Sequence, residues 1–142
     1  MAAALTIYNS AIFNEAKGLI DYDTDTVYAM LVGEGYTVDK DAHDYRNDIT
    51  SEPTGAGYTS GGASVSVTVT QDNTNDRTDI TLGAVSWPTS TLVARGIVYY
   101  KRRGGASSAD ELICHVDFGS TFSTVADTFN VAAQILRKQN LT

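Results

Sequence analysis

The chain has 142 residues, 42% of them hydrophobic and 19% charged, which suits one soluble domain over residues 1–142. Its formal charge of −7 argues against a surface that neutralises phosphates, so we expect no nucleic-acid partner. No apolar run reaches the roughly 18 residues of a membrane helix, so we expect no membrane contact.

Cysteine content and the first residues indicate where the chain folds. A single cysteine, Cys114, cannot form an internal disulfide, which indicates folding in a reducing cytoplasm. The opening letters MAAALTIY lack the basic start and long apolar centre of a signal peptide. We therefore expect that the protein is made and folds in the cytoplasm of the producing cell.

A short helix is expected near the N-terminus. Asn9 or Ser10 would cap it, and Gly18 would mark its end. Three apolar side chains would lie on one side of this helix, those of Ile12, Phe13 and Ala16.

The stretch DYDTDTVYAMLV places Asp21, Asp23 and Asp25 at alternate positions before an apolar run. A calcium loop of the helix-loop-helix type needs a glycine at its sixth position and a bidentate Glu at its twelfth. Those positions hold Thr26 and Val32. A solvated entrance to a strand therefore explains the pattern better than a metal site.

The stretch VDKDAHDYRND predicts one or two helical turns. Asp39 would cap them and place Ala42, Tyr45 and Ile49 on one side. His43 and its acidic neighbours are of the types that bind metals, but a second histidine is absent from this stretch. We interpret it as a capped turn on the surface.

Period-two patterns follow. Val65, Val67 and Val69 alternate with Ser and Thr, which predicts a strand with one dry and one wet face. Farther along, the apolar face shifts by one position after Gly83, as at a β-bulge, and Pro88 is expected to close that strand.

The runs TLVARGIVYYK and ELICHVDF flank RRGGASSAD and predict a hairpin. Lys101, Arg102 and Arg103 leave the first strand, and Asp110 and Glu111 return into the second. We expect these opposite charges to meet across the hairpin.

The second strand of this hairpin and the C-terminal tail complete the pattern. Cys114 falls on the apolar face of the strand as a small core residue, whereas His115 falls on the opposite face, toward solvent or a neighbouring strand. The tail FNVAAQILRKQNLT fits a strand or a short helix, and the need to pair sheet edges favours a strand.

These elements predict an all-β fold, a sandwich or jelly-roll-like barrel with one or two short helices. We find no G-x-S-x-G elbow and no phosphate loop, and nothing selects one pair of carboxylates among the 17 acidic residues. We therefore expect no enzyme and no cofactor, and assign no catalytic, cofactor-binding or metal-binding residue.

Five residues are predicted to contact a partner. Tyr36 and Tyr58 lie in expected loops, where tyrosine supplies contact area at low entropic cost. Lys101, Arg102 and Arg103 form a basic hairpin end that would suit an acidic partner.

The order of several motifs resembles a family of small structural proteins in the virions of tailed bacteriophages. The motifs are GLIDYDTDTVYAMLV, YTVDKDAHDYRNDITSE, GAGYTSGG, a valine strand, VSWP, ARGIVYYK and HVDFG, and the resemblance covers about residue 8 to the end. Within that family the chain looks most like capsid decoration (cement) proteins with a jelly-roll-like fold. The charged segment YKRRGGASSADELI departs from the shared motifs.

The resemblance implies a phage structural protein that binds the outer surface of the capsid. Its partner would be the major capsid protein, bound across neighbouring subunits, with self-association as a dimer or trimer. The virion would be its location, after synthesis in the host cytoplasm, and no catalytic residues are implied.

Two other functions stay open. The first is another virion component, such as a head-tail connector, tail tube or fibre protein. The second is a carbohydrate-binding module for host attachment, which would need an exposed aromatic platform or a close carboxylate pair. Trp87, just before a proline, fits a core position better than such a platform.

Overall fold

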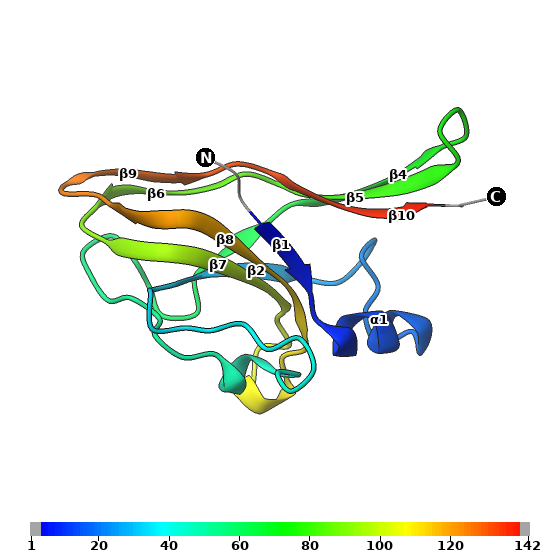
Figure 1. The fold of residues 1–142 in the computed structure, drawn as a ribbon, viewed down its shortest axis with the longest axis horizontal. Coiled ribbons are helices and arrows are strands. Elements are labelled where there is room, and N and C mark those ends of the chain that lie inside the picture. The colour runs from blue at the N-terminus through cyan, green and yellow to red at the C-terminus, as the bar shows by residue number, and fades with distance from the viewer. Residues whose placement is uncertain (1–3, 140–142) are drawn as a thin grey trace.

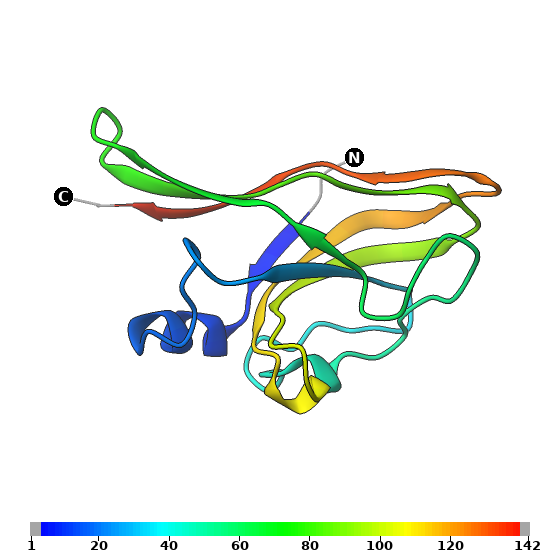
Figure 2. The same cartoon turned by 180° about the vertical axis from the view of Figure 1, so that it is seen from behind.

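The computed structural model describes residues 4–139, which form an all-β sandwich, as the sequence predicts (Figures 1 and 2). One layer is an antiparallel sheet of five strands in the order β1-β8-β7-β2-β3. Its strands are β1 (Ala4–Ile7), β2 (Val27–Val32), β3 (Ala63–Val65), β7 (Val93–Lys101) and β8 (Leu112–Ser123).

The second layer consists of a three-stranded sheet, β10-β5-β4, and a two-stranded sheet, β6-β9. Its strands are β4 (Val67–Asp72), β5 (Arg77–Leu82), β6 (Val85–Ser90), β9 (Asp127–Val131) and β10 (Gln134–Gln139). The helical elements are α1 (Asn9–Ala16) and two 3-10 turns, η1 (Arg46–Asp48) and η2 (Ser107–Ala109).

Strands β2 and β7 and the first part of β8, residues 112–116, are buried on both faces. Leu31, Ile97 and Cys114 belong to the core between the two layers, so Cys114 lies where its sequence pattern predicts. Val98 and Tyr100 belong to a second apolar cluster on the opposite face. Because both faces are covered, the apolar runs in these strands need no alternation.

The valine strand is divided between the two layers. Ser66 separates β3, which pairs with β2, from β4, which pairs with β5. Val65 and Val67 are only partly buried, and Val69 is 44% exposed. The predicted dry valine face is therefore right for Val65 and Val67, which pack against the core, and wrong for Val69, because the first layer does not extend under the far end of β4.

Strands β4, β5 and β10 extend beyond the first layer, to the right in Figure 1 and to the left in Figure 2. We call these three strands the projecting arm. The prediction of a C-terminal strand is confirmed, because β10 forms one edge of this arm.

The predicted shift of the apolar face at Gly83 is confirmed. Leu82 is buried before it and Val85 after it, where the chain passes from β5 to β6. The Gly83 N–H donates to the Ser66 carbonyl at 2.7 Å. Pro88 does not close the strand as predicted, because β6 continues to Ser90 through a register irregularity.

Helix α1 presents a different side to the core than we expected. Tyr8, rather than Asn9 or Ser10, occupies the N-cap position. Ala11 and Asn14 are buried, whereas Ile12 is 53% and Phe13 61% exposed. The helix follows β1 directly, so the buried Tyr8 at that junction determines which side faces the sheet.

The predicted helical turns after Asp39 are shorter than expected. The Asp39 carboxylate accepts hydrogen bonds from the N–H groups of Asp41 and Ala42, both at 3.1 Å, so it does cap a turn. After this turn, the predicted stretch contains one helical segment, η1. Tyr45 occupies the N-cap position of η1. Ile49 packs against the second apolar cluster.

Candidate functional site

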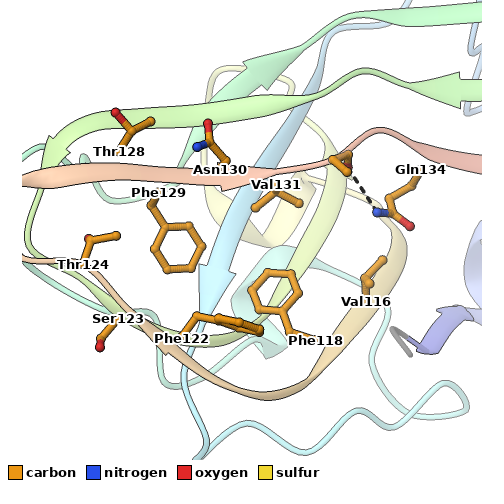
Figure 3. Close-up of a pocket in the computed structure, with 11 residues that line it drawn as sticks. Val116, Phe118, Phe122, Ser123, Thr124, Thr128, Phe129, Asn130, Val131 and Gln134 are labelled. Carbon is orange, nitrogen blue, oxygen red and sulfur yellow. Dashed lines mark hydrogen bonds between the residues drawn. The ribbon is translucent and has the colours of Figure 1, made fainter. Parts of the chain in front are cut away.

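An apolar cleft lies between β8 and β9, with a volume of about 320 Å³. Figure 3 shows Phe118 and Phe122 of β8 and Phe129 and Val131 of β9 pointing into the space between the two strands. We call it the phenylalanine cleft. The residues that line it are Val116, Phe118, Phe122, Ser123, Thr124, Thr128, Phe129, Asn130, Val131, Ala132 and Gln134.

The three phenylalanine rings form a connected aromatic wall. Phe118 meets Phe122 edge-on with ring centroids 6.0 Å apart, and it lies 6.2 Å from Phe129. Phe129 is buried, but Phe122 is 46% exposed. No lining residue carries a charge, so the cleft suits an apolar side chain and not an ion.

Unpaired strand edges border the cleft. Strand β1 pairs with β8 only as far as Asp117, so residues 118–123 have no partner on that side within the described chain. Strand β9 is paired with β6 alone in the same part of the structure. An extended segment could thus bond to a strand edge while its side chain enters the cleft.

The structure separates the residues predicted to contact a partner. Tyr36 is only 8% exposed, and its hydroxyl shares hydrogen bonds with the Tyr8 hydroxyl at 2.7 Å and His43 Nδ1 at 2.9 Å. Burial raises the pKa of Tyr36. Its loop folds back onto the sheet, so the expectation of an accessible Tyr36 was wrong.

Tyr58 anchors the glycine-rich loop to the core. Its hydroxyl donates to Glu52 at 2.6 Å and accepts from the Leu31 N–H at 3.0 Å. Its ring lies 5.5 Å from Trp87, itself 4% exposed. Burial raises the pKa of Tyr58 well above its usual value. The side chain is only partly available for contact.

Lys101, Arg102 and Arg103 lie together at the hairpin end, but each has a partner inside the chain. Lys101 Nζ lies 2.9 Å from an Asp25 carboxylate oxygen, and the guanidinium of Arg102 lies 4.4 Å from the centroid of the Tyr28 ring. Arg102 and Arg103 remain exposed at this end.

The predicted meeting of charges across the hairpin is confirmed for one pair. Arg103 donates to both carboxylate oxygens of Glu111, at 2.8 and 2.6 Å. Burial alone would raise the pKa of Glu111, but hydrogen bonds from Arg103 and the backbone hold it below its usual value. Asp110 instead pairs with Arg46 from η1, at 2.8 Å.

In the acidic stretches at residues 21–25 and 39–48, carboxylates accept hydrogen bonds from nearby backbone N–H groups. Asp25 accepts from the Asp21 N–H at 2.8 Å, and Asp21 accepts from the Asp23 N–H at 3.0 Å. In the second stretch, the Asp48 carboxylate accepts from the N–H groups of Asp44 and Tyr45. Across residues 4–139, no group of three or more His, Cys, Asp and Glu side chains could hold a metal ion.

His115 is buried, although the sequence pattern allowed it to face solvent. It is 6% exposed and lies 5.4 Å from Tyr36, measured between ring centroids. Burial lowers the pKa of His115 to about 4, while Asp117 has a weaker opposite effect. The loop that buries Tyr36 also covers this histidine, which the sequence did not indicate.

No protein-family model, curated protein or solved structure matches this chain in the comparisons with known proteins. Within the described part of the chain, no helix combines the length and apolar character needed to cross a membrane.

Proposed function

We propose that this chain is a structural protein of a tailed-phage particle, most like a capsid decoration protein. It would bind the outer shell across neighbouring major capsid subunits and stabilise the assembled form. The order of sequence motifs supports the phage class, and the phenylalanine cleft is the observation that carries the fastening role.

The cleft supports a role in binding. An apolar side chain of a shell subunit would bury Phe122, which is 46% exposed in the free protein. Fully burying an exposed apolar side chain contributes about 1.5–3 kcal/mol, so covering the half-exposed Phe122 contributes a modest amount for a single site. Repetition over a lattice, with the protein as a dimer or trimer, would raise the effective strength. Binding only the assembled shell then stabilises that shell by mass action.

The net charge of the chain supports a location on the outer surface of the capsid. A net charge of −7 is repelled by packaged DNA, so the proposed location is the outside of the capsid, after synthesis in the host cytoplasm. The exposed Arg102 and Arg103 are the predicted contact residues best placed to reach an acidic part of the shell.

Copy number in purified virions tests the proposed class. Quantitative mass spectrometry should find hundreds of copies, comparable with the major capsid protein. About six or twelve copies would instead indicate a ring at the head-tail junction. Absence from the particle would contradict both.

A paired substitution tests the cleft. Phe122→Asp should abolish binding to purified shells because it introduces a charge into an apolar site. Phe13→Asp is the matched control, since Phe13 is 61% exposed on α1 and does not line the cleft. Loss of binding in the control with retention in Phe122→Asp would show that another surface fastens the protein.

The projecting arm favours a second candidate, a ring-forming head-tail connector or tail-tube component. Strands β4, β5 and β10 project beyond the first layer, and a projecting element of this kind suits contacts between the parts of a ring. The carbohydrate-binding alternative has less support, because Trp87 is buried and cannot stack on a sugar.

A further inference from the structure

Strand β4 of the projecting arm has an unprotected edge. Among the described residues it pairs only with β5. Its first five residues, 67–71, include no charge and no proline, and the only charge on the strand is Asp72 at its far end, which pairs with Arg77 of β5. Charges and prolines are the usual devices that keep a strand edge from pairing with another chain. This edge is therefore open to a further strand.

The register indicates which backbone groups point outward. The Gly83 N–H donates to the Ser66 carbonyl, so these two residues form a hydrogen-bonded pair just before β4. Such pairs alternate along antiparallel strands. The N–H and C=O groups of Val67, Val69 and Gln71 consequently point to the free edge.

The opposite edge of the arm differs. On β10, Lys138 points inward and bonds to Glu15 of α1 at 2.9 Å. Arg137 on the same strand bonds to Asp79 at 2.8 Å. An inward-pointing charge blocks the addition of a strand, so β4 is the accessible edge of this sheet.

A groove of about 380 Å³ lies beneath β4. Ile20, Tyr22, Val69 and Ile80 supply its apolar lining. Val69 has its side chain on the inner face of the arm, yet 44% of the residue is exposed. An apolar side chain of an added strand would cover Val69 and fill part of this groove.

The rim of the groove is acidic. Asp21 and Asp23 line it, are exposed, and form no ion pair with any described residue. The neighbouring acids differ, because Glu15 pairs with Lys138 and Asp25 with Lys101. Two uncompensated carboxylates beside an apolar groove favour a ligand that carries a basic residue.

We infer that the β4 edge and this groove bind an extended segment of another protein. The segment pairs with the outward groups of Val69, places an apolar side chain in the groove, and directs a Lys or Arg toward Asp21 and Asp23. This surface lies on the projecting arm, at the end of the molecule away from the β8–β9 turn (Figure 1). The inference therefore does not depend on the proposed function.

A second copy of the chain fits this surface less well. A second copy carries a net charge of −7, which the acidic rim at Asp21 and Asp23 disfavours at this surface. The basic residues on β10 of that copy could not reach the acidic rim, because Arg137 is already paired with Asp79 and Lys138 with Glu15. A basic segment from a different protein meets neither obstacle.

Selection from a displayed library of random octapeptides tests the inference. Peptides enriched on the wild type should alternate β-branched or apolar residues with at least one Lys or Arg. A selected peptide, labelled and measured by fluorescence anisotropy, should bind Val69→Pro at least ~10-fold more weakly, because proline removes an outward N–H. Asp23→Asn should weaken binding by ~2-fold to 5-fold, as expected for one exposed charge pair.

Two controls keep the result decisive. Asp127→Asn makes the same charge change on β9 and should leave peptide affinity unchanged. Hydrogen exchange on the wild type should show slower exchange at Val67, Val69 and Gln71 when the peptide is bound, which does not depend on the folding of any variant. Acidic consensus peptides, protection elsewhere, or dimerisation of the free protein through β4 would overturn the inference.

Discussion

The five-stranded sheet and the projecting arm are built from similar β-branched sequence, yet they differ in what covers them. Strands β2, β7 and β8 have apolar clusters on both faces. The arm has a layer under only part of one face, so that Val69 and Ile135 are 44% and 48% exposed. Strand propensity is therefore common to both regions, whereas stability should concentrate in the covered sheet and binding in the uncovered arm.

The largest expected contrast comes from truncating matched aliphatic side chains. Leu31→Ala removes a fully buried side chain from β2 and should destabilise by about 2–5 kcal/mol. Ile135→Ala in β10 should cost less than about 1 kcal/mol, because Ile135 is 48% exposed. Urea unfolding followed by tryptophan fluorescence measures both. Equal losses would contradict the division between sheet and arm.

A buried ion pair extends the contrast to polar groups. The Asp110 side chain is 1% exposed and bonds to Arg46 at 2.8 Å beside the five-stranded sheet. Asp110→Ala leaves that arginine without its partner and should cost about 3 kcal/mol. Asp79→Ala removes an acid that contacts Arg77 and whose closer partner, Arg137, lies on the arm surface. We expect its unfolding midpoint to stay close to the wild type, since solvent screens that pair.

Acid sensitivity should also arise in the covered sheet. Burial lowers the pKa of His115 to about 4, so on acidification the unfolded chain binds a proton first. Stability from this group is complete above about pH 6.5 and falls as the pH drops toward 4, by about 3 kcal/mol in total. Between pH 7 and 5 the wild type should lose about 2 kcal/mol more than His115→Gln. Equal pH slopes in the two proteins would contradict this assignment.

The sequence predicted where strands form, but it did not predict which parts of those strands are covered by another layer of the fold. Alternation identified β4 and the phase shift at Gly83, because strand geometry is local. It could not show that Val69 projects past the first layer, since coverage depends on where a distant strand ends. Helix α1 illustrates the same limit, because Phe13 carries a core-type side chain yet is 61% exposed.

The candidate sites were harder to predict for a related reason. Phe118 and Phe129 meet only because β8 and β9 lie in different layers, so no local motif marks their cleft. Tyr36 was expected to be accessible because it lies in a loop, but that loop folds back and the ring contacts His115. The confirmed hairpin pair of Arg103 and Glu111 was predictable because the turn itself brings these residues together.

The smallest expected effect uses a substitution that keeps side-chain shape. Val69→Thr in β4 should change stability by less than about 0.5 kcal/mol, because water reaches the new hydroxyl. Val98→Thr in β7 makes the same change at a residue with 0% exposure, where the hydroxyl must be buried and should cost about 1–3 kcal/mol. Thermal unfolding of both variants isolates the effect of burial, because the Val→Thr change in β-propensity and side-chain volume is the same at both positions. A larger loss for Val69→Thr would mean that the underside of β4 is dry, and the groove could then not accept an added side chain.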